Sequence, residues 1–118
     1  MITKEHALAF AHHWIQSWNA HNLDEILSHY TDDFEMTTPF IVSLMNIADG
    51  TLQGKDKVGT YWKKALEKYT DLTFELIDVL YSVNSVTIYY RSVAGKKAVE
   101  FFMFNEQNKV YKAIAHYD

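Results

Sequence analysis

Glu100 is the residue of this sequence whose type and setting most favour chemistry. It stands between Val99 and Phe101 in a stretch rich in apolar and aromatic residues. Carboxylates are seldom buried in such surroundings unless they are paired. Burial disfavours the charged form, so a carboxyl in this setting can act as a general acid or base near neutral pH.

Arg91, the only arginine of the chain, is the natural partner for Glu100. If Gly95 and Lys96 form a two-residue hairpin loop, Arg91 stands directly opposite Glu100 on the neighbouring strand. The pair would then be either the polar centre of an apolar pocket or a cross-strand salt bridge on an exposed edge. A loop shifted by one residue would break the pairing. Glu100 and Arg91 are the catalytic residues that the sequence predicts.

Other kinds of reactive site are missing from the sequence. The six histidines include no pair four residues apart, so no helix carries a two-histidine metal-binding face. The chain has no cysteine, which excludes disulfides, thiolate metal sites and a cysteine nucleophile. Neither the glycine-rich nucleotide-binding motifs nor the G-x-S-x-G motif of serine hydrolases occurs. We therefore expect no metal and no cofactor.

Composition narrows the class of protein further. A length of 118 residues suits one domain spanning residues 1–118. The formal net charge is −4 and the basic residues are scattered, which argues against nucleic-acid binding. No stretch approaches the ~20 apolar residues of a membrane span, and the first residues do not resemble a signal peptide. We expect a cytoplasmic protein that does not bind membranes.

Three helices are predicted in the N-terminal half. Residues 4–18 carry apolar side chains at steps of three and four, which is typical of a helix with one buried face. A short helix is predicted over residues 22–30 and a third over residues 55–69. The apolar stretch 39–53 fits either a short helix that acts as a lid or a loop packed on the core.

The other segments are predicted to be strands, because they are rich in Val, Ile, Tyr and Phe. These segments are residues 34–38, 73–83, 86–93, 97–104 and 109–117. The last four are separated by short turns, which are typical of antiparallel hairpins. Helices first and a meander last indicate an α+β fold, with helices on one face of a curved, mainly antiparallel sheet.

The segment 97–104 alternates, yet both of its faces are apolar. Glu100 and Phe102 share one face, and Val99, Phe101 and Met103 share the other. Neither face suits free solvation, so one should meet the helices and the other a second subunit. This pattern predicts a homodimer.

At this level of detail the chain resembles a known superfamily. The resemblance rests on the order of the elements and on the segments Tyr30-Thr31-Asp32-Asp33-Phe34, Leu52-Gln53-Gly54-Lys55-Asp56-Lys57-Val58 and Ala113-Ile114-Ala115-His116-Tyr117. The chain resembles the nuclear transport factor 2-like superfamily, in particular its SnoaL-like branch of polyketide cyclases and ketosteroid isomerases. This resemblance covers nearly the whole chain. The resemblance implies a cone-shaped fold, in which a strongly curved sheet and helices enclose an apolar pocket, usually in a homodimer. That superfamily hosts isomerases, dehydratases, cyclases, epoxide hydrolases and non-catalytic members, so the fold alone does not fix the activity.

The resemblance also implies roles for single residues. The steroid isomerase pattern has a general-base aspartate before a proline at the end of the first strand, and Thr38 stands there in this sequence. Its oxyanion tyrosine corresponds to Trp14, and its second acid corresponds to Glu100. Tyr30 keeps a supporting tyrosine, and Trp62 occupies the position of another. An acid is thus retained without the base, so steroid isomerisation by that mechanism is not expected.

These inferences predict one cavity around Glu100 that holds a small apolar molecule. Its predicted lining comprises Trp14, Trp18, Tyr30, Thr38, Trp62, Phe102, Ala115 and Tyr117. The predicted function is binding of that molecule, with conversion by general acid/base chemistry at Glu100. The alternatives are ligand binding without turnover and a dimerisation domain with an incidental pocket.

Overall fold

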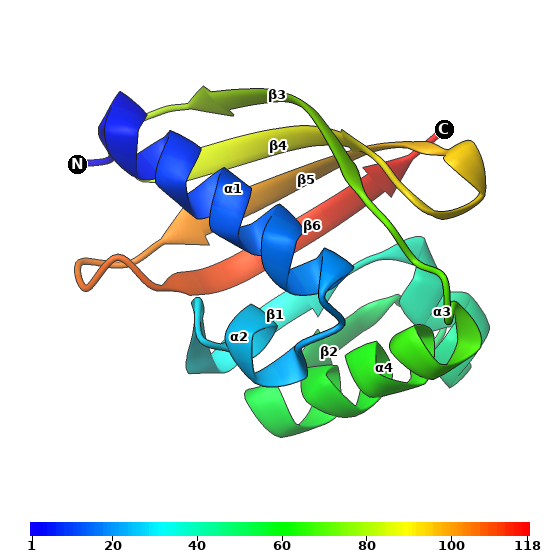
Figure 1. Cartoon of the computed structure of the whole chain (residues 1–118). Coiled ribbons are helices and arrows are strands. Elements are labelled where there is room, and N and C mark those ends of the chain that lie inside the picture. Colours follow the sequence, from blue (N-terminus) through cyan, green and yellow to red (C-terminus); the bar gives the residue numbers. More distant parts are fainter.

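Six strands form one sheet that curls around the centre of the molecule (Figure 1). The computed structural model describes all 118 residues. The strands are β1 (Tyr30–Thr37), β2 (Thr51–Gln53), β3 (Glu75–Tyr81), β4 (Ser85–Arg91), β5 (Lys97–Phe104) and β6 (Val110–Tyr117). They lie in the order β2-β1-β6-β5-β4-β3. Every neighbouring pair is antiparallel except β1 and β6, which run parallel. The predicted mainly antiparallel α+β fold is confirmed.

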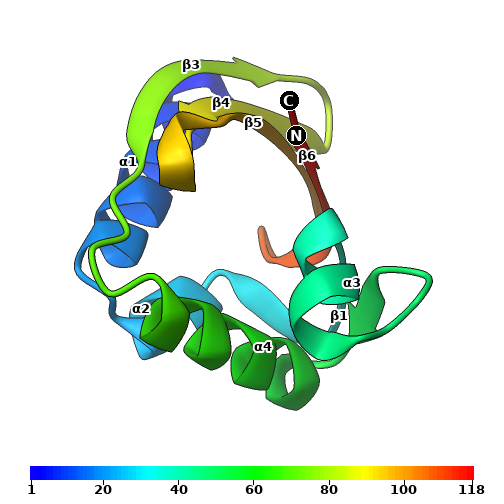
Figure 2. The same ribbon diagram turned by 90° about the vertical axis from the view of Figure 1, so that its right-hand side faces the viewer.

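Four helices close the side of the molecule that the curled sheet leaves open. They are α1 (Lys4–Asn19), α2 (Leu23–Leu27), α3 (Pro39–Met45) and α4 (Lys55–Lys68), and a short 3₁₀ turn follows β4 at Val93–Gly95. Figure 2 shows the elements as a ring, with the sheet curling round one side and the helices closing the other. None of the helices combines the length and the apolar character that crossing a membrane requires.

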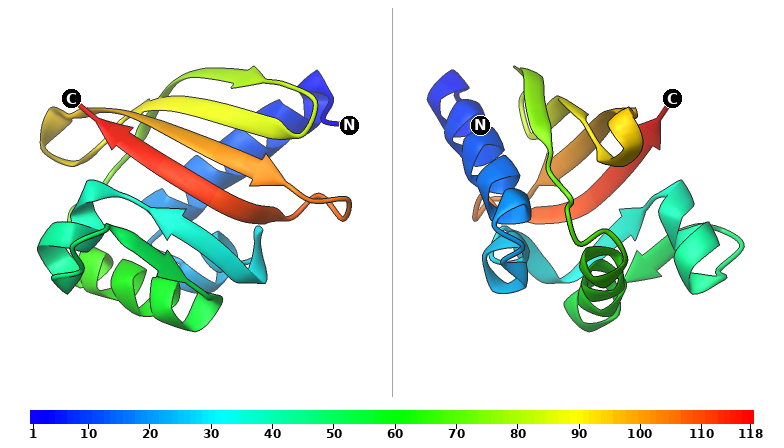
Figure 3. Two further views of the ribbon diagram at one scale, coloured as in Figure 1. Left: turned by 180° about the vertical axis from the view of Figure 1, so that it is seen from behind. Right: turned by 45° about the vertical axis from the view of Figure 1, so that its right-hand side comes forward.

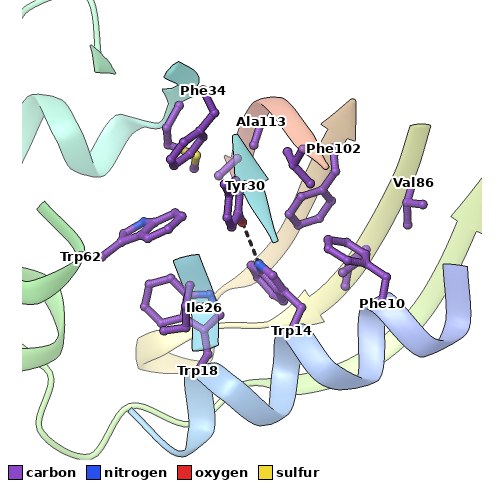
Figure 4. Close-up of a cluster of buried hydrophobic side chains, with 14 of the residues drawn as sticks. Phe10, Trp14, Trp18, Ile26, Tyr30, Phe34, Trp62, Val86, Phe102 and Ala113 are labelled. Atoms are coloured by element: carbon purple, nitrogen blue, oxygen red, sulfur yellow. Dashed lines mark hydrogen bonds between the residues drawn. The ribbon is translucent and has the colours of Figure 1, made fainter. Parts of the chain in front are cut away.

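The first helix presents one apolar stripe to the interior. Its start is fixed by Thr3, whose hydroxyl accepts a hydrogen bond from the backbone N–H of His6 at 3.1 Å. Phe10, Trp14 and Trp18 follow at steps of four, and all three are buried. The stripe faces the concave side of the sheet, so α1 both covers the core and brings two indole rings to its centre (Figure 4).

The stretch after β1 forms a helix and then a short strand. Thr38 caps α3 by accepting from the backbone N–H of Phe40 at 3.3 Å, and Pro39 takes the first helical position, where its missing N–H costs nothing. The backbone N–H of Thr38 also donates to the carbonyl oxygen of Gly50, so the two ends of the segment 38–50 lie side by side. Gly50 has φ +66° and a Cβ there would lie 3.1 Å from the Thr38 oxygen, so only glycine fits at this position.

The largest difference from the predicted boundaries lies between the second helix and β1. The second helix ends at Leu27, and Tyr30 is the first residue of β1 and not part of that helix. The early start of β1 is stabilised by the parallel contact with β6, in which the N–H of Val110 donates to the carbonyl of His29. Strand β2 was not expected, because three residues are too few to show a pattern.

The core and the outer surface lie on opposite faces of the same sheet. A cluster of 26 buried apolar residues fills the space between the concave face and the helices. Seen from behind in Figure 3, strands β4, β5 and β6 carry no helix over their convex face. Helices therefore cover one face of the sheet only.

Candidate active site

A narrow cavity lies between the concave face of the sheet and helices α1, α3 and α4. Its lining residues are Trp14, Trp18, Met36, Phe40, Leu44, Tyr61, Trp62, Ala65, Tyr69, Leu72, Phe74, Tyr90, Ser92, Val93, Glu100 and Tyr117. Its volume is about 40 Å³. One enclosed water occupies roughly 10–15 Å³ by this measure, so the cavity has room for a few waters or a small organic group. Glu100 is the only carboxyl in its wall.

Strand register sets the position of Glu100. It pairs with Ile88 on β4 and with Ala115 on β6, and it is only 3% exposed. Two residues before Glu100 on β5, Ala98 lies between Tyr90 and Tyr117, which are its partners on either side. Both tyrosines are therefore diagonal neighbours of Glu100, a spacing that aromatic side chains can reach across. The small side chains of Ala98 and Ala115 leave room beside the carboxyl.

The predicted pairing of Arg91 with Glu100 is wrong. Arg91 pairs with Lys97, because the loop between β4 and β5 spans residues 92–96 and contains the 3₁₀ turn. The longer loop moves the register, and Ile88 takes the place opposite Glu100. The Arg91 side chain is exposed, and its Nη1 donates to the carbonyl of Gly95 at 3.0 Å. Glu100 therefore has no cationic partner from Arg91.

The Glu100 carboxyl is held in its neutral form. Burial raises its pKa from 4.5 to about 8, and a hydrogen bond from Tyr90 acts in the opposite direction. In that bond the Tyr90 hydroxyl donates to Oε1 at 3.2 Å. The second oxygen, Oε2, has no hydrogen-bond partner in the protein and belongs to a residue of the cavity wall. A protonated carboxyl with one free oxygen can donate to a ligand and later accept a proton back.

The tyrosines around Glu100 keep their protons as well. Burial, and after it the charge of Glu100, raises the pKa of Tyr90 well above its usual value of 10. The pKa of Tyr117 is raised by the same two causes, and hydrogen bonding to Tyr90, followed by hydrogen bonding to Thr38, opposes them. For Tyr61 burial is again the main cause of a raised pKa, followed by the charge of Tyr117. At neutral pH this end of the cavity therefore offers hydroxyl groups and no base.

Of the residues predicted to line the cavity, Trp14, Trp18, Trp62, Tyr117 and Glu100 lie in its wall. Four others are buried outside the wall. Tyr30 accepts a hydrogen bond from Trp14 Nε1 at 3.0 Å (Figure 4), and Phe102 packs edge-to-face on Trp14 and Phe10. Thr38 caps α3, as described above. Ala115 is the β6 partner of Glu100 and does not line the cavity.

The sequence pattern of the SnoaL-like domain matches residues 11–116, nearly the whole chain. The chain belongs to the SnoaL-like family. A solved SnoaL-like protein of unknown function from Burkholderia thailandensis is 49% identical over 99% of this chain and 98% of its own, with a TM-score of 0.96.

More distant structures share the SnoaL-like fold alone. A candidate ketosteroid isomerase from Kribbella flavida is 14% identical over 97% of this chain and 78% of its own, with a TM-score of 0.75. The epoxide hydrolase/cyclase-like enzyme SalBIII of pyran ring formation in salinomycin is 12% identical over 100% of this chain and 95% of its own, with a TM-score of 0.79. Among proteins of curated function, none matches the sequence significantly.

Tyr90 is the hydrogen-bond partner of Glu100 that the sequence argument missed. It alternates with Ile88 and Val86, which are also buried, so the inner face of β4 could be read from the pattern. Its contact with Glu100 depended on the loop length, which the sequence argument took as too short. Phe40 and Leu44 of α3 were missed as well, because the sequence did not decide whether residues 39–53 form a helix or a loop.

Three titratable side chains meet outside the cavity, on the surface between α1 and α2. His13 Nδ1 lies 2.6 Å from His29 Nε2, and His13 Nε2 lies 3.1 Å from Glu25. Burial, and then the charge of His13, lowers the pKa of His29 from 6.5 to about 4. No group of three or more such side chains converges on a point where a metal ion could be bound.

Proposed function

We propose that this protein binds a small, uncharged and mainly apolar molecule in the cavity and converts it by proton transfer at Glu100. The observation that carries the proposal is a single buried carboxyl, neutral at pH 7, with one oxygen unpaired in an aromatic cavity. Such a group donates a proton to a carbonyl, hydroxyl or epoxide oxygen and receives one back later.

The rest of the wall limits the reaction to what one carboxyl can do. Tyr61, Tyr90 and Tyr117 hold their protons and serve as hydrogen-bond donors. Thr38, at the place where the steroid isomerase pattern has a base, cannot take up a proton at neutral pH. Glu100 must therefore supply and recover the proton itself, which favours isomerisation, dehydration or acid-assisted ring opening and closure of one small molecule.

A second candidate is binding without turnover. It is favoured by the small cavity and by the lack of a second proton-transfer group beside Glu100. Pockets for drug-sized ligands measure about 300–1,000 Å³, so a ligand of that size would fit only if residues of the cavity wall moved.

The experiment offers the purified protein a panel of small cyclic ketones, allylic alcohols and epoxides and follows each by NMR. We expect at least one to be bound and converted, and conversion to be lost in Glu100→Gln, because an amide cannot transfer a proton. Glu35→Gln is the matched control, since Glu35 lies outside the cavity and pairs with Lys112 at 3.4 Å. Binding with equal conversion by wild type and Glu100→Gln would refute the acid/base role. A wild type that binds no member of the panel would refute the ligand site.

We further propose that the protein is a homodimer through the convex face of the sheet. Val99, Phe101 and Met103 lie on that face, half-buried within one chain, and no helix covers them (Figure 3). Contiguous apolar surface of this kind usually marks an interaction site.

A further inference from the structure

One polar side-chain atom that is closed to solvent lacks a hydrogen-bond partner, and its residue lines the cavity. The indole Nε1 of Trp18 is the only side-chain nitrogen or oxygen that is itself closed to solvent and has no hydrogen bond. Trp18 is 5% exposed and lines the cavity together with Glu100. One helical turn earlier, Trp14 Nε1 donates to Tyr30 at 3.0 Å (Figure 4). The two indoles share a helix face, and only one of them has an acceptor.

An unpaired buried N–H calls for a specific explanation. The large majority of buried polar groups in native proteins are hydrogen-bonded, and leaving a donor unpaired costs about 1–3 kcal/mol. Bulk water does not supply the acceptor, because the atom is closed to solvent. The edge-to-face contact of Trp18 with Trp62, at 5.3 Å between ring centroids, offers an aromatic ring, which is a weak acceptor.

We propose that Trp18 Nε1–H is a ligand-binding donor, and that the ligand places an uncharged acceptor oxygen against it in addition to the group on which Glu100 acts. This inference rests on the ligand site of the proposed function. It makes the ligand a small molecule with two oxygen functions on an apolar body, such as a hydroxyketone, an ether ketone or an epoxy ketone. Trp18 then determines specificity, because a hydrocarbon at that position leaves the donor unpaired.

The charge of the wall supports an uncharged ligand. No lysine, arginine or histidine lines the cavity, and Arg91, the nearest candidate by sequence, lies on the exposed side of the β4–β5 connection. A carboxylate or phosphate bound here would be desolvated without a counter-charge, which is very costly. A carbonyl, ether or hydroxyl oxygen needs only a donor, and Trp18 supplies one.

The test uses acetone as a small acceptor probe and xenon as an apolar probe of the same cavity. The indole N–H signals of the three tryptophans are followed by NMR in ¹⁵N-labelled protein. We expect acetone to move the Trp18 signal downfield, because its N–H gains an acceptor. Xenon should fill the cavity without that shift. The Trp14 signal serves as internal reference for an N–H that is already bonded.

A substitution then separates recognition from packing. Trp18→Phe keeps an aromatic ring and removes the N–H. We expect it to weaken acetone binding about five-fold, the effect of one hydrogen bond, as measured on the Leu44 methyl signals. Xenon affinity should not fall, whereas a merely structural role for Trp18 would weaken the binding of both probes.

Several results would overturn the inference. One is a Trp18 signal that acetone leaves unmoved while the Leu44 methyls report binding, as a buried water or the Trp62 ring would produce. Another is equal acetone affinity in wild type and Trp18→Phe. These results leave the proposed function standing. If acetone and xenon both fail to perturb the cavity, the ligand site itself is refuted. Because the wild-type shift needs no variant, the test holds even if Trp18→Phe folds poorly.

Discussion

The two faces of β5 have similar composition but differ in their exposure to solvent. On the concave face, Ala98, Glu100, Phe102 and Phe104 are at most 4% exposed. On the convex face, the alternate residues Val99, Phe101 and Met103 remain half-buried. The difference lies in what covers them, since the helices pack against one face only. Alternation therefore assigns residues to faces, and the rest of the fold decides which face becomes a site and which remains an open surface.

The comparison also shows how the same burial acts on different side chains. Phe102 gains from losing contact with water, whereas Glu100, two residues earlier on the same face, loses solvation of its charge. The molecule resolves this by keeping the carboxyl protonated and giving it one donor, Tyr90. Substitutions on each face can test whether this assignment is correct.

The largest expected effect is the dependence of stability on pH. The pKa of Glu100 is raised on folding, so between pH 4.5 and about 8 the folded state holds a proton that the unfolded state has released. Stability from this group is fully present below pH 4.5 and is lost as pH rises to 8. The loss is on the order of 5 kcal/mol in the free energy of unfolding. Urea unfolding across this pH range measures it.

Glu100→Gln should remove that slope on the alkaline side. It should match the wild type near pH 4.5 and exceed its stability at pH 8. Its stability should still fall below pH 6.5, because the lowered pKa of His29 makes protonation favour the unfolded state. The surface variant Glu35→Gln should retain the wild-type slope. A stability difference between wild type and Glu100→Gln that is the same at pH 5 and pH 8 would show that Glu100 is not desolvated.

The next effect compares two adjacent phenylalanines of β5. Phe102→Ala should cost about 3–5 kcal/mol in unfolding free energy, because it empties a fully buried site against Phe10 and Trp14. Phe101→Ala should cost about 1 kcal/mol in dilute solution and more at high protein concentration, where a dimer would bury it. Equal costs at all concentrations would remove the distinction between the faces.

The dimer is tested more directly by placing a charge on the convex face. Phe101→Lys should shift a dimer to monomer and raise the Kd of the dimer at least ten-fold, because a buried unpaired charge is costly at an interface. Analytical ultracentrifugation measures the change. Gln107→Lys, at an exposed position in the turn before β6, adds the same charge away from β5 and should leave the assembly intact. A wild type that sediments as a monomer at micromolar concentration would refute the proposed interface.

The smallest effect concerns the one hydrogen bond to the carboxyl. Tyr90→Phe removes the donor to Glu100 Oε1, which now opposes the effect of burial on its pKa. The pKa of Glu100 should therefore rise above 8, and unfolding free energy at pH 6 should fall by about 1 kcal/mol. NMR titration of the labelled carboxyl carbon reports the pKa. An unchanged value would show that Tyr90 does not donate to this group in solution.

The sequence prediction was correct where a periodic pattern ran over many residues. It failed where the structure depends on the geometry of a short turn. The stripe of α1 and the alternation of β5 were readable, because 16 and 8 residues give repeated signals. The Arg91 pairing failed because the two-residue loop was an assumption about turn geometry. Ala94 and Gly95 adopt positive φ within a longer turn, and alanine gives no sequence signal for that conformation.

Other parts of the site had signals that were present and weak. Thr38 followed by Pro39 is a helix start, and Asn46 with φ 57° is a helix end, so α3 could have been chosen over a loop. The lack of an acceptor for Trp18 had no signal at all, because it depends on the distance between rings in three dimensions. Sequence thus predicted the carboxyl at the centre of the site and could not predict which groups contact it.

The parallel contact between β1 and β6 has a consequence for synthesis of the chain. Strands β3 to β6 follow one another as neighbours, so they can pair as each leaves the ribosome. Strand β1 emerges early, yet its long partner is the last strand made, and it must wait for Val110–Tyr117 before it can dock. A chain halted before Val110 would contain every residue of the cavity wall except Tyr117, but strands β1 and β2 would lack the strand that joins them to β3–β5. The cavity wall is therefore completed only after β6 has been made and has docked between β1 and β5.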